Sequence, residues 1–401
     1  MIMKFEDSPS MTPQLISKHP NMGTTIFTVM SGLAAEAGAV NLGQGFPDYD
    51  GPPEVLRTAQ EQIALGNNQY PPGIGVADLR RAVSEHQKRF WGLEYDPNSE
   101  ILITVGASEA IAASLLGLLN DGDEVVVFEP LFDTYAGLTS LGGAVLKPVT
   151  LRPQASGRFT FDEAELTQAF SSKSRVILLN SPHNPTGTVF TTEELRIIAR
   201  HAIERNLIVI SDEVYEHLVF DNAVHVPIAT LPGMHERTIT ISSGGKSFNV
   251  TGWKIGWACA PAHLVNAVRM AKQLFTFAGG TPFQVAIAAG LRLPDEYFST
   301  LAADLQEKRD ILTTALTTAG LAPIKPEGTY FITADISSRW SHLNSLEFCQ
   351  QLPHACGVVA IPASVLYHPT HAAEGTHLVR FAFCKQLSTI HEASERLVNW
   401  K

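Results

Sequence analysis

Short apolar runs rich in β-branched residues alternate with longer helical patterns from about residue 100 onward, and this alternation constrains the fold most. The runs span residues 101–105, 124–128, 175–179, 207–211, 238–242 and 254–258. Thr191 with Glu194, and Asp162 with Glu165, have the spacing of capping boxes that start helices between the runs. Strand–helix alternation predicts an α/β fold with a largely parallel sheet that carries helices on both faces.

The two ends of the chain differ from the middle. Long helical patterns at 294–319, 345–352 and 389–400 surround short strand patterns near 330–334 and 378–383. A chain of 401 residues is too long for one simple core. We therefore expect a large domain over residues 51–290 and a smaller α+β domain built from residues 1–50 and 291–401.

Composition excludes several classes of function. The net charge of −11 argues against a nucleic-acid or anionic-membrane surface, and no apolar run reaches the length of a membrane span. The N-terminus shows no basic-then-apolar signal segment. Cys259, Cys349, Cys356 and Cys384 are scattered without a paired metal-binding spacing. They fit reduced thiols in a cytoplasmic protein, and we predict no metal site.

The segment around Lys246 carries the strongest chemical signal. An apolar run, 238–241, leads into Ser242-Ser-Gly-Gly-Lys-Ser247, and Lys254 follows eight residues after Lys246. Ser243, Lys246 and Lys254 together suit a phosphate-bearing cofactor whose aldehyde is held by a lysine as a Schiff base. Such a lysine must lose its proton near neutral pH, which burial and a neighbouring cation favour. The alternatives are a solvated turn or a P-loop, but a P-loop needs glycine at position 240, where threonine stands.

Polar groups follow four of the predicted strands, at the edge where open α/β sheets bind their ligands. They are Gly106-Ala-Ser-Glu-Ala110, which opens a helix with free N–H groups, then Asn184, then Asp212 with Tyr215, and finally Lys246. Each has an alternative interpretation. The segment Gly106–Ala110 nearly matches the nucleophile elbow of hydrolases, which would make Ser108 a nucleophile. Asp212 could cap a helix, and Asn184 could belong only to a turn. Tyr215 could be a half-buried packing residue.

Arg380 lies in the alternating strand pattern 378–383. An arginine inside an apolar strand needs a partner, which is either structural or a substrate carboxylate, and the planar fork of guanidinium suits a carboxylate.

These residues together resemble the class I aminotransferases of fold type I, which use pyridoxal 5′-phosphate (PLP). The resemblance is greatest to kynurenine, methionine and glutamine aminotransferases and to actinobacterial N-succinyldiaminopimelate aminotransferases. It runs from about Thr24 to the C-terminus and includes the motifs Asn41–Asp48, Asn68–Tyr70, Glu129–Tyr135 and Gly328–Phe331. It implies a seven-stranded, largely parallel sheet sandwiched by helices, a small α+β domain, and a homodimer with shared active sites.

The resemblance also implies a role for each candidate residue. Lys246 holds PLP as a Schiff base and later acts as the general base, while Asp212 pairs with the ring nitrogen. Asn184 and Tyr215 bond the 3-oxygen of the ring. The remaining implied contacts are stacking by Phe132, phosphate binding by Ala107, Ser108, Ser243, Lys254 and, across the dimer, Tyr70, and substrate binding by Gly45, Asn184, Arg380, Phe27 and Phe277.

The expected reaction moves an amino group from an L-amino acid to a 2-oxo acid by a ping-pong mechanism. Two classes of donor stay open. N-succinyl-LL-2,6-diaminopimelate, a lysine-biosynthesis donor, needs a further cation near the pocket. Methionine, glutamine or an aromatic amino acid such as kynurenine needs an apolar pocket, which Phe27, Phe46 and Phe277 could line, although Phe27 and Phe277 could equally be core and dimer-interface packing.

Two other functions remain as alternatives. A PLP-dependent carbon–sulfur β-lyase can use the same scaffold, because PLP chemistry branches after proton removal. A PLP-binding regulatory module ranks last, because no basic helix-turn-helix pattern precedes residue 40.

Overall fold

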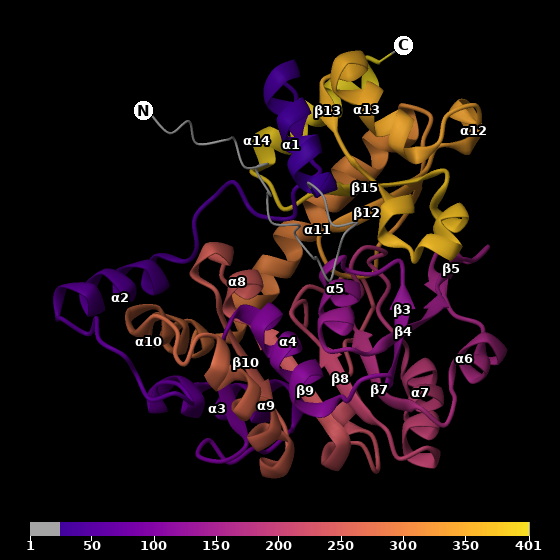
Figure 1. Cartoon of the computed structure of the whole chain (residues 1–401). Coiled ribbons are helices and arrows are strands. Elements are labelled where there is room, and N and C mark those ends of the chain that lie inside the picture. Colours follow the sequence, from indigo (N-terminus) through magenta and orange to yellow (C-terminus); the bar gives the residue numbers. More distant parts are fainter. Residues whose placement is uncertain (1–24, 401) are drawn as a thin grey trace, which may run out of the picture.

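A seven-stranded sheet forms the centre of the computed structural model, which describes residues 25–400 (Figure 1). Its strands are β2 (Ile101–Val105), β3 (Glu124–Glu129), β4 (Val145–Thr150), β7 (Ser174–Asn180), β8 (Ile208–Asp212), β9 (Thr238–Ser243) and β10 (Ile255–Cys259). They lie in the order β2-β10-β9-β8-β7-β3-β4. Neighbours run parallel except β10, which is antiparallel to both β2 and β9. The predicted α/β fold with a largely parallel sheet is confirmed.

Helices cover both faces of this sheet, because successive strand residues point to opposite sides. Val125 and Val127 pack into a core with α4 (Gly106–Leu118), α5 (Thr134–Leu141) and α9 (Ala262–Phe275). Val126 and Phe128 pack on the other side with α6 (Glu163–Ala169) and α7 (Thr192–Glu204). At the β2–β10 end, that second side is covered by α2 (Pro53–Ala64), α3 (Ala77–Trp91) and α10 (Thr281–Leu291).

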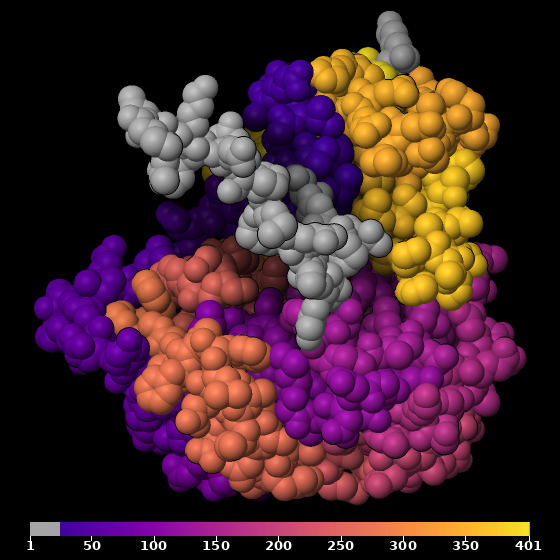
Figure 2. All heavy atoms as spheres, viewed as in Figure 1, coloured from indigo at the N-terminus to yellow at the C-terminus, as the bar shows by residue number. Residues whose placement is uncertain are grey.

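A second, antiparallel sheet has the order β11 (Ala322–Ile324), β12 (Phe331–Asp335), β15 (Leu378–Ala382), β14 (Ile361–Pro362). It shares a core with α1 (Ile26–Ala37), α13 (Ser345–Cys356) and α14 (Leu387–Val398). β1 (Val40–Asn41) also pairs with β13 (Val358–Val359). Segments from the two ends of the chain therefore pack together, and Figure 2 shows α1 against the C-terminal elements. The predicted boundaries at residues 50 and 290 stay predictions.

One long helix, α11 (Asp295–Thr318), belongs to both cores. Phe298 near its start packs with the large sheet, whereas Leu305 and Leu312 pack with the small sheet. The helix therefore ties the two sheets together. The remaining short elements are β5 (Arg152–Pro153), β6 (Phe159–Thr160), α8 (Gly244–Ser247) and α12 (Ser337–Trp340).

Local features partly follow the sequence patterns. The capping box of Thr191 and Glu194 is present. Asp162 caps α6, but Glu165 bonds Thr150 N and Arg152 in place of completing the second box. The patterns missed β4, which contains a proline. As the edge strand, β4 can lack that backbone donor.

Helix polarity and the state of the cysteines agree with the composition of the chain. Within residues 25–400, every helix is too short or too polar to cross a bilayer. The four cysteines are unpaired, as expected for reduced thiols, while the cytoplasmic location stays a prediction.

The contact between α4 and α9 depends on a glycine. A Cβ atom at Gly117 would lie 2.6 Å from the carbonyl oxygen of Ala267. We expect Gly117→Ala to destabilise the protein by about 1–3 kcal/mol, because the helices must separate. Gly32 in α1 has open space around it, so Gly32→Ala should raise stability by up to about 1 kcal/mol through helix propensity. Thermal unfolding midpoints of the two variants check this order, and a Gly117→Ala midpoint at or above wild type would contradict the packing.

Candidate active site

A cavity of about 410 Å³ opens at the C-terminal ends of the central strands, facing the small sheet. The predicted site residues that line it are Phe27, Gly45, Ala107, Ser108, Phe132, Asn184, Asp212, Tyr215, Ser243, Lys246, Lys254 and Arg380. Tyr70 and Phe277 lie outside it. Their side chains are exposed (85% and 47%) and their rings meet edge to face at 6.1 Å. One cavity thus gathers most of the predicted set.

One end of the cavity is suited to an anion. Helix α4 starts at Gly106 without a side-chain cap, so its first N–H groups are available to a ligand. The ammonium of Lys254 lies against this helix start, because a Cβ on Gly106 would be 3.2 Å from Lys254 Nζ. The cavity-lining Ser108 and Ser243 add hydroxyl donors. Free N–H groups, a cation and two hydroxyls match a phosphate group.

Asp212 is the last residue of β8 and is buried. Its Oδ2 accepts a hydrogen bond from the Tyr135 hydroxyl (2.5 Å), and its Oδ1 accepts one from Val214 N (3.3 Å). Burial raises the pKa of Asp212 to about 6, despite these bonds. A cationic ring nitrogen beside this carboxylate would stabilise its charged form. The chain continues as a turn after Asp212, so the alternative of a helix cap is wrong.

Asn184 is held in place by its neighbours at the strand ends. Its backbone N–H donates to Oδ1 of Asn180 (2.8 Å), and the amide of Asn180 donates to the carbonyl of Asp212 (2.8 Å). Tyr215 is buried with its ring edge-on to that of Tyr330, and burial raises the pKa of its hydroxyl. Both side chains line the cavity beside Asp212.

Lys246 lies in the one-turn helix α8 and is only partly exposed, so the alternative of a solvated turn is wrong. The glycines before it allow close packing: a Cβ on Gly244 would lie 2.6 Å from Ile287, and one on Gly245 would lie 3.1 Å from the backbone of Thr251. The amine of Lys246 donates to the hydroxyl of Tyr330 at 2.7 Å. Burial lowers the pKa of Lys246 from 10.5 to about 8, so roughly a tenth of the amine is neutral at pH 7.

Arg380 projects from β15 of the small sheet and is buried. Its guanidinium donates to Oδ1 of Asn184 and to the carbonyl of Gly43, both at 3.1 Å. The group lies 4.1 Å from the ring centre of Phe331 and 5.3 Å from that of Phe27. Burial lowers its pKa to about 10, which leaves it cationic at neutral pH. Its Nε atom has no hydrogen-bond partner among residues 25–400, so the guanidinium keeps donor capacity for a carboxylate.

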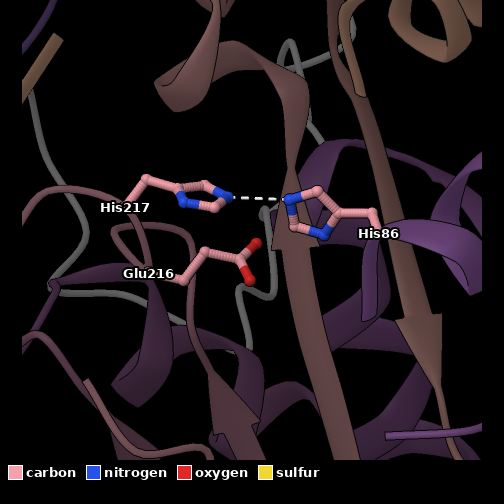
Figure 3. A group of neighbouring side chains, drawn as sticks. All are labelled: His86, Glu216 and His217. Atoms are coloured by element: carbon pink, nitrogen blue, oxygen red, sulfur yellow. Dashed lines mark hydrogen bonds between the residues drawn. The ribbon is translucent and has the colours of Figure 1, made fainter. Parts of the chain in front are cut away.

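A second group of titratable side chains is not among the residues that line the cavity and consists of His86, Glu216 and His217 (Figure 3). The two Nε2 atoms of the histidines are 2.7 Å apart, and Glu216 accepts bonds from Trp91 Nε1 and Ser242 Oγ at 2.6 Å each. Burial lowers the pKa of His86 to about 3 and raises that of Glu216 to about 7. The two Nε2 atoms and the Glu216 carboxylate are engaged in hydrogen bonds, whereas His86 Nδ1 has no partner among residues 25–400. These bonds tie α3 and β9 to the turn that follows β8.

The sequence patterns missed three residues that bond to the site: Tyr135 and Asn180, which line the cavity, and Tyr330, which bonds Lys246. Tyr135 and Tyr330 lie in motifs that contributed to the family resemblance, but no role had been assigned to them. Asn180 ends β7, so the rule that ligands bind at strand ends could have found it.

The donor set fits PLP. The same cavity is lined by phosphate-binding groups, a buried carboxylate, a lysine of lowered pKa and an arginine with an unused donor.

Comparison with known proteins agrees with this geometry. The family model described as "Aminotransferase class I and II" matches residues 37–397. The chain is 49% identical over 388 residues to the Mycobacterium tuberculosis protein named "Probable N-succinyldiaminopimelate aminotransferase DapC", covering 95% of this chain and 97% of the relative. It is 40% identical over 381 residues to the methionine aminotransferase of Escherichia coli, covering 95% and 97%.

A solved structure shows the same fold. The N-succinyldiaminopimelate aminotransferase structure from Mycobacterium tuberculosis superposes with a TM-score of 0.93 at 48% identity, over 97% of this chain and 100% of that one. The family match spans most of the chain, and these relatives are named as aminotransferases, so a lyase is not favoured. The chain therefore belongs to the class I and II aminotransferase family and is a PLP-dependent transaminase of fold type I.

Proposed function

We propose that Arg380 binds the α-carboxylate of the amino-acid donor and that Lys246 moves the donor's α-proton. The observation that carries this is one cavity holding both an arginine with spare donor capacity and a lysine whose pKa is about 8. A base with a pKa near the working pH is efficient in proton transfer. A 2-oxo acid would bind the same arginine in the second half of the reaction.

The other residues hold and tune the cofactor in this proposal. PLP, when bound, supplies a carbonyl carbon for the amino group and a ring that accepts electrons. Lys254, Ser108, Ser243 and the N–H of Ala107 bind the phosphate. Asp212 binds the ring nitrogen, Asn184 and Tyr215 bind the ring oxygen, and Phe132 packs on the ring face. Gly45 completes the pocket for the donor carboxylate.

For the donor, we propose N-succinyl-LL-2,6-diaminopimelate. The support is the relative of that name at 49% identity over nearly the full length of both chains. The second candidate is methionine, glutamine or an aromatic amino acid including kynurenine. The aromatic lining of Phe27, Phe46, Phe132 and Phe331 favours it, as does the methionine aminotransferase at 40% identity.

A half-reaction panel separates the two donor classes. PLP-loaded enzyme is mixed with N-succinyl-LL-2,6-diaminopimelate, L-methionine, L-glutamine or L-kynurenine, and loss of the cofactor band near about 400 nm is followed. We expect the succinylated donor to react fastest at equal concentration. If methionine or kynurenine reacts faster, the second candidate replaces the first.

Lys246→Ala provides the control for chemistry in the same panel. Removing a positioned general base should slow the half-reaction by about 10²–10⁴-fold or more. Lys325→Ala removes an exposed lysine that pairs with Asp221 and should leave the rate unchanged. Equal rates for Lys246→Ala and wild type would refute the assigned role of Lys246.

The pH dependence of cofactor binding tests the environment of Lys246. Only the neutral amine attacks an aldehyde, and burial sets the pKa of this amine at about 8. We expect the rate constant for PLP association with cofactor-free protein to rise about tenfold per pH unit below about pH 8 and to level off above it. Stopped-flow absorbance from pH 6 to 10 checks this. A midpoint near the ordinary lysine pKa of 10.5 would show that Lys246 is solvated.

We propose a homodimer in which Tyr70 and Phe277 reach the neighbouring cavity. In support, these two rings lie in contact on the surface, and the large apolar side chains Leu65, Met270 and Leu274, which are close to them in sequence, are also exposed. Sedimentation velocity should give a particle of twice the chain mass. A Leu274→Glu variant should weaken the dimer, and a monomeric wild-type protein with full activity would overturn the proposal.

A further inference from the structure

We propose that Tyr330 is the positioning residue for Lys246: its hydroxyl orients the lysine amine for proton transfer and links it to the loop that holds Arg380. This inference rests on the proposed role of Lys246 as the base. Tyr330 is 2% exposed, and its hydroxyl lies 2.7 Å from Lys246 Nζ and 2.7 Å from the carbonyl oxygen of Gly45.

The direction of these two hydrogen bonds follows from chemistry. A carbonyl oxygen can only accept, so the single hydroxyl proton of Tyr330 is donated to Gly45. The oxygen of Tyr330 therefore offers a lone pair to Lys246, and the lysine must donate an N–H to it. The lone pair of a neutral Lys246 amine is then not used by Tyr330. It stays free to accept a proton from the donor's α-carbon.

Tyr330 does not compete for that proton. Burial raises the pKa of its hydroxyl well above the ordinary value, so it stays a neutral phenol. A neutral oxygen facing an N–H group stabilises the charged ammonium more than the neutral amine. We therefore expect the hydrogen bond to Tyr330 to oppose the effect of burial on the pKa of Lys246.

The loop 43–45 connects this contact to the carboxylate clamp. The carbonyl of Gly43 accepts from Arg380, and that of Gly45 accepts from Tyr330. Gly45 packs closely against the core of the small sheet, because a Cβ there would lie 2.6 Å from the ring of Phe331. Tyr330 directly precedes β12, and Arg380 lies in β15, which pairs with β12. The loop and the strand pair together fix the position of Lys246 relative to Arg380.

Tyr330→Phe removes only the hydroxyl. The ring contacts with Tyr215 (5.1 Å between centres) and Phe331 (4.8 Å) can persist, so a purely packing role for Tyr330 would survive this change. Tyr297→Phe is the matched control. The hydroxyl of Tyr297 also donates to a backbone carbonyl at 2.7 Å, that of Ser247, next to the catalytic lysine in sequence. Within residues 25–400, the hydroxyl that bonds Lys246 Nζ is that of Tyr330 and not that of Tyr297.

The test measures the half-reaction of each PLP-loaded variant with a donor and with the same donor deuterated at the α-carbon. For Tyr330→Phe we expect at least a tenfold slower reaction, less than a threefold change in apparent donor affinity, and a larger isotope effect. Tyr297→Phe should stay within twofold of wild type in all three. Thermal midpoints of both variants verify that they are folded.

A second measurement does not depend on turnover. The pH midpoint for PLP association with cofactor-free Tyr330→Phe should fall by about one pH unit, because the ammonium loses its acceptor. A rate and midpoint equal to those of Tyr297→Phe would overturn the proposal. A slower reaction without change in isotope effect or pH midpoint would also overturn it, leaving Tyr330 a structural role. If Lys246→Ala itself kept the wild-type rate, the proposed function would fail instead.

Discussion

The burial of one carboxylate, that of Asp212, sets the conditions for the rest of the site. A carboxylate removed from water is less stable in its charged form, and its pKa rises to about 6. Tyr135 and Val214 N stabilise its oxygens, while Asn180 holds its backbone carbonyl. Bonds from Trp91 and Ser242 to Glu216 fix the turn behind it. The carboxylate is thus held in place, and its hydrogen bonds do not fully offset the cost of burying its charge. A cationic ring nitrogen beside it would therefore be favoured.

The groups that we propose for chemistry and for substrate recognition come from different parts of the fold. Asp212 ends β8 of the large sheet and Lys246 lies in α8, directly after β9 of that sheet, whereas Arg380 belongs to the small sheet. The bond between Arg380 and Asn184 crosses this boundary, and α11 packs in the cores on both sides of it. The alignment of donor and base therefore depends on how the two sheets are held together.

Much of the fold could be predicted because its strands are buried and apolar, and their ends carry the polar residues. Asp212, Asn184 and Lys246 could be found this way, since each follows a recognisable run. Strand β4 was missed because an edge strand tolerates Lys147 and Pro148, which break the pattern. Tyr135 and Tyr330 were given no role because their importance lies in hydroxyl contacts with residues 77 and 84 positions away. No local spacing in the sequence encodes such contacts. The pocket for the donor's side chain is also built from residues far apart in the chain, so the sequence patterns do not define it.

The reversed direction of β10 has an electrostatic consequence. Ile255 pairs with Val105 and Gly256 pairs with Ser243, so β10 begins where β2 and β9 end. Lys254 directly precedes β10 and therefore lies beside the start of helix α4. Had β10 run parallel to its neighbours, Lys254 would lie at the opposite edge, displaced by a strand length of roughly 15 Å. A single change of chain direction thus concentrates the positive ends of a side chain and a helix dipole at one point, which no all-parallel arrangement of these segments would do.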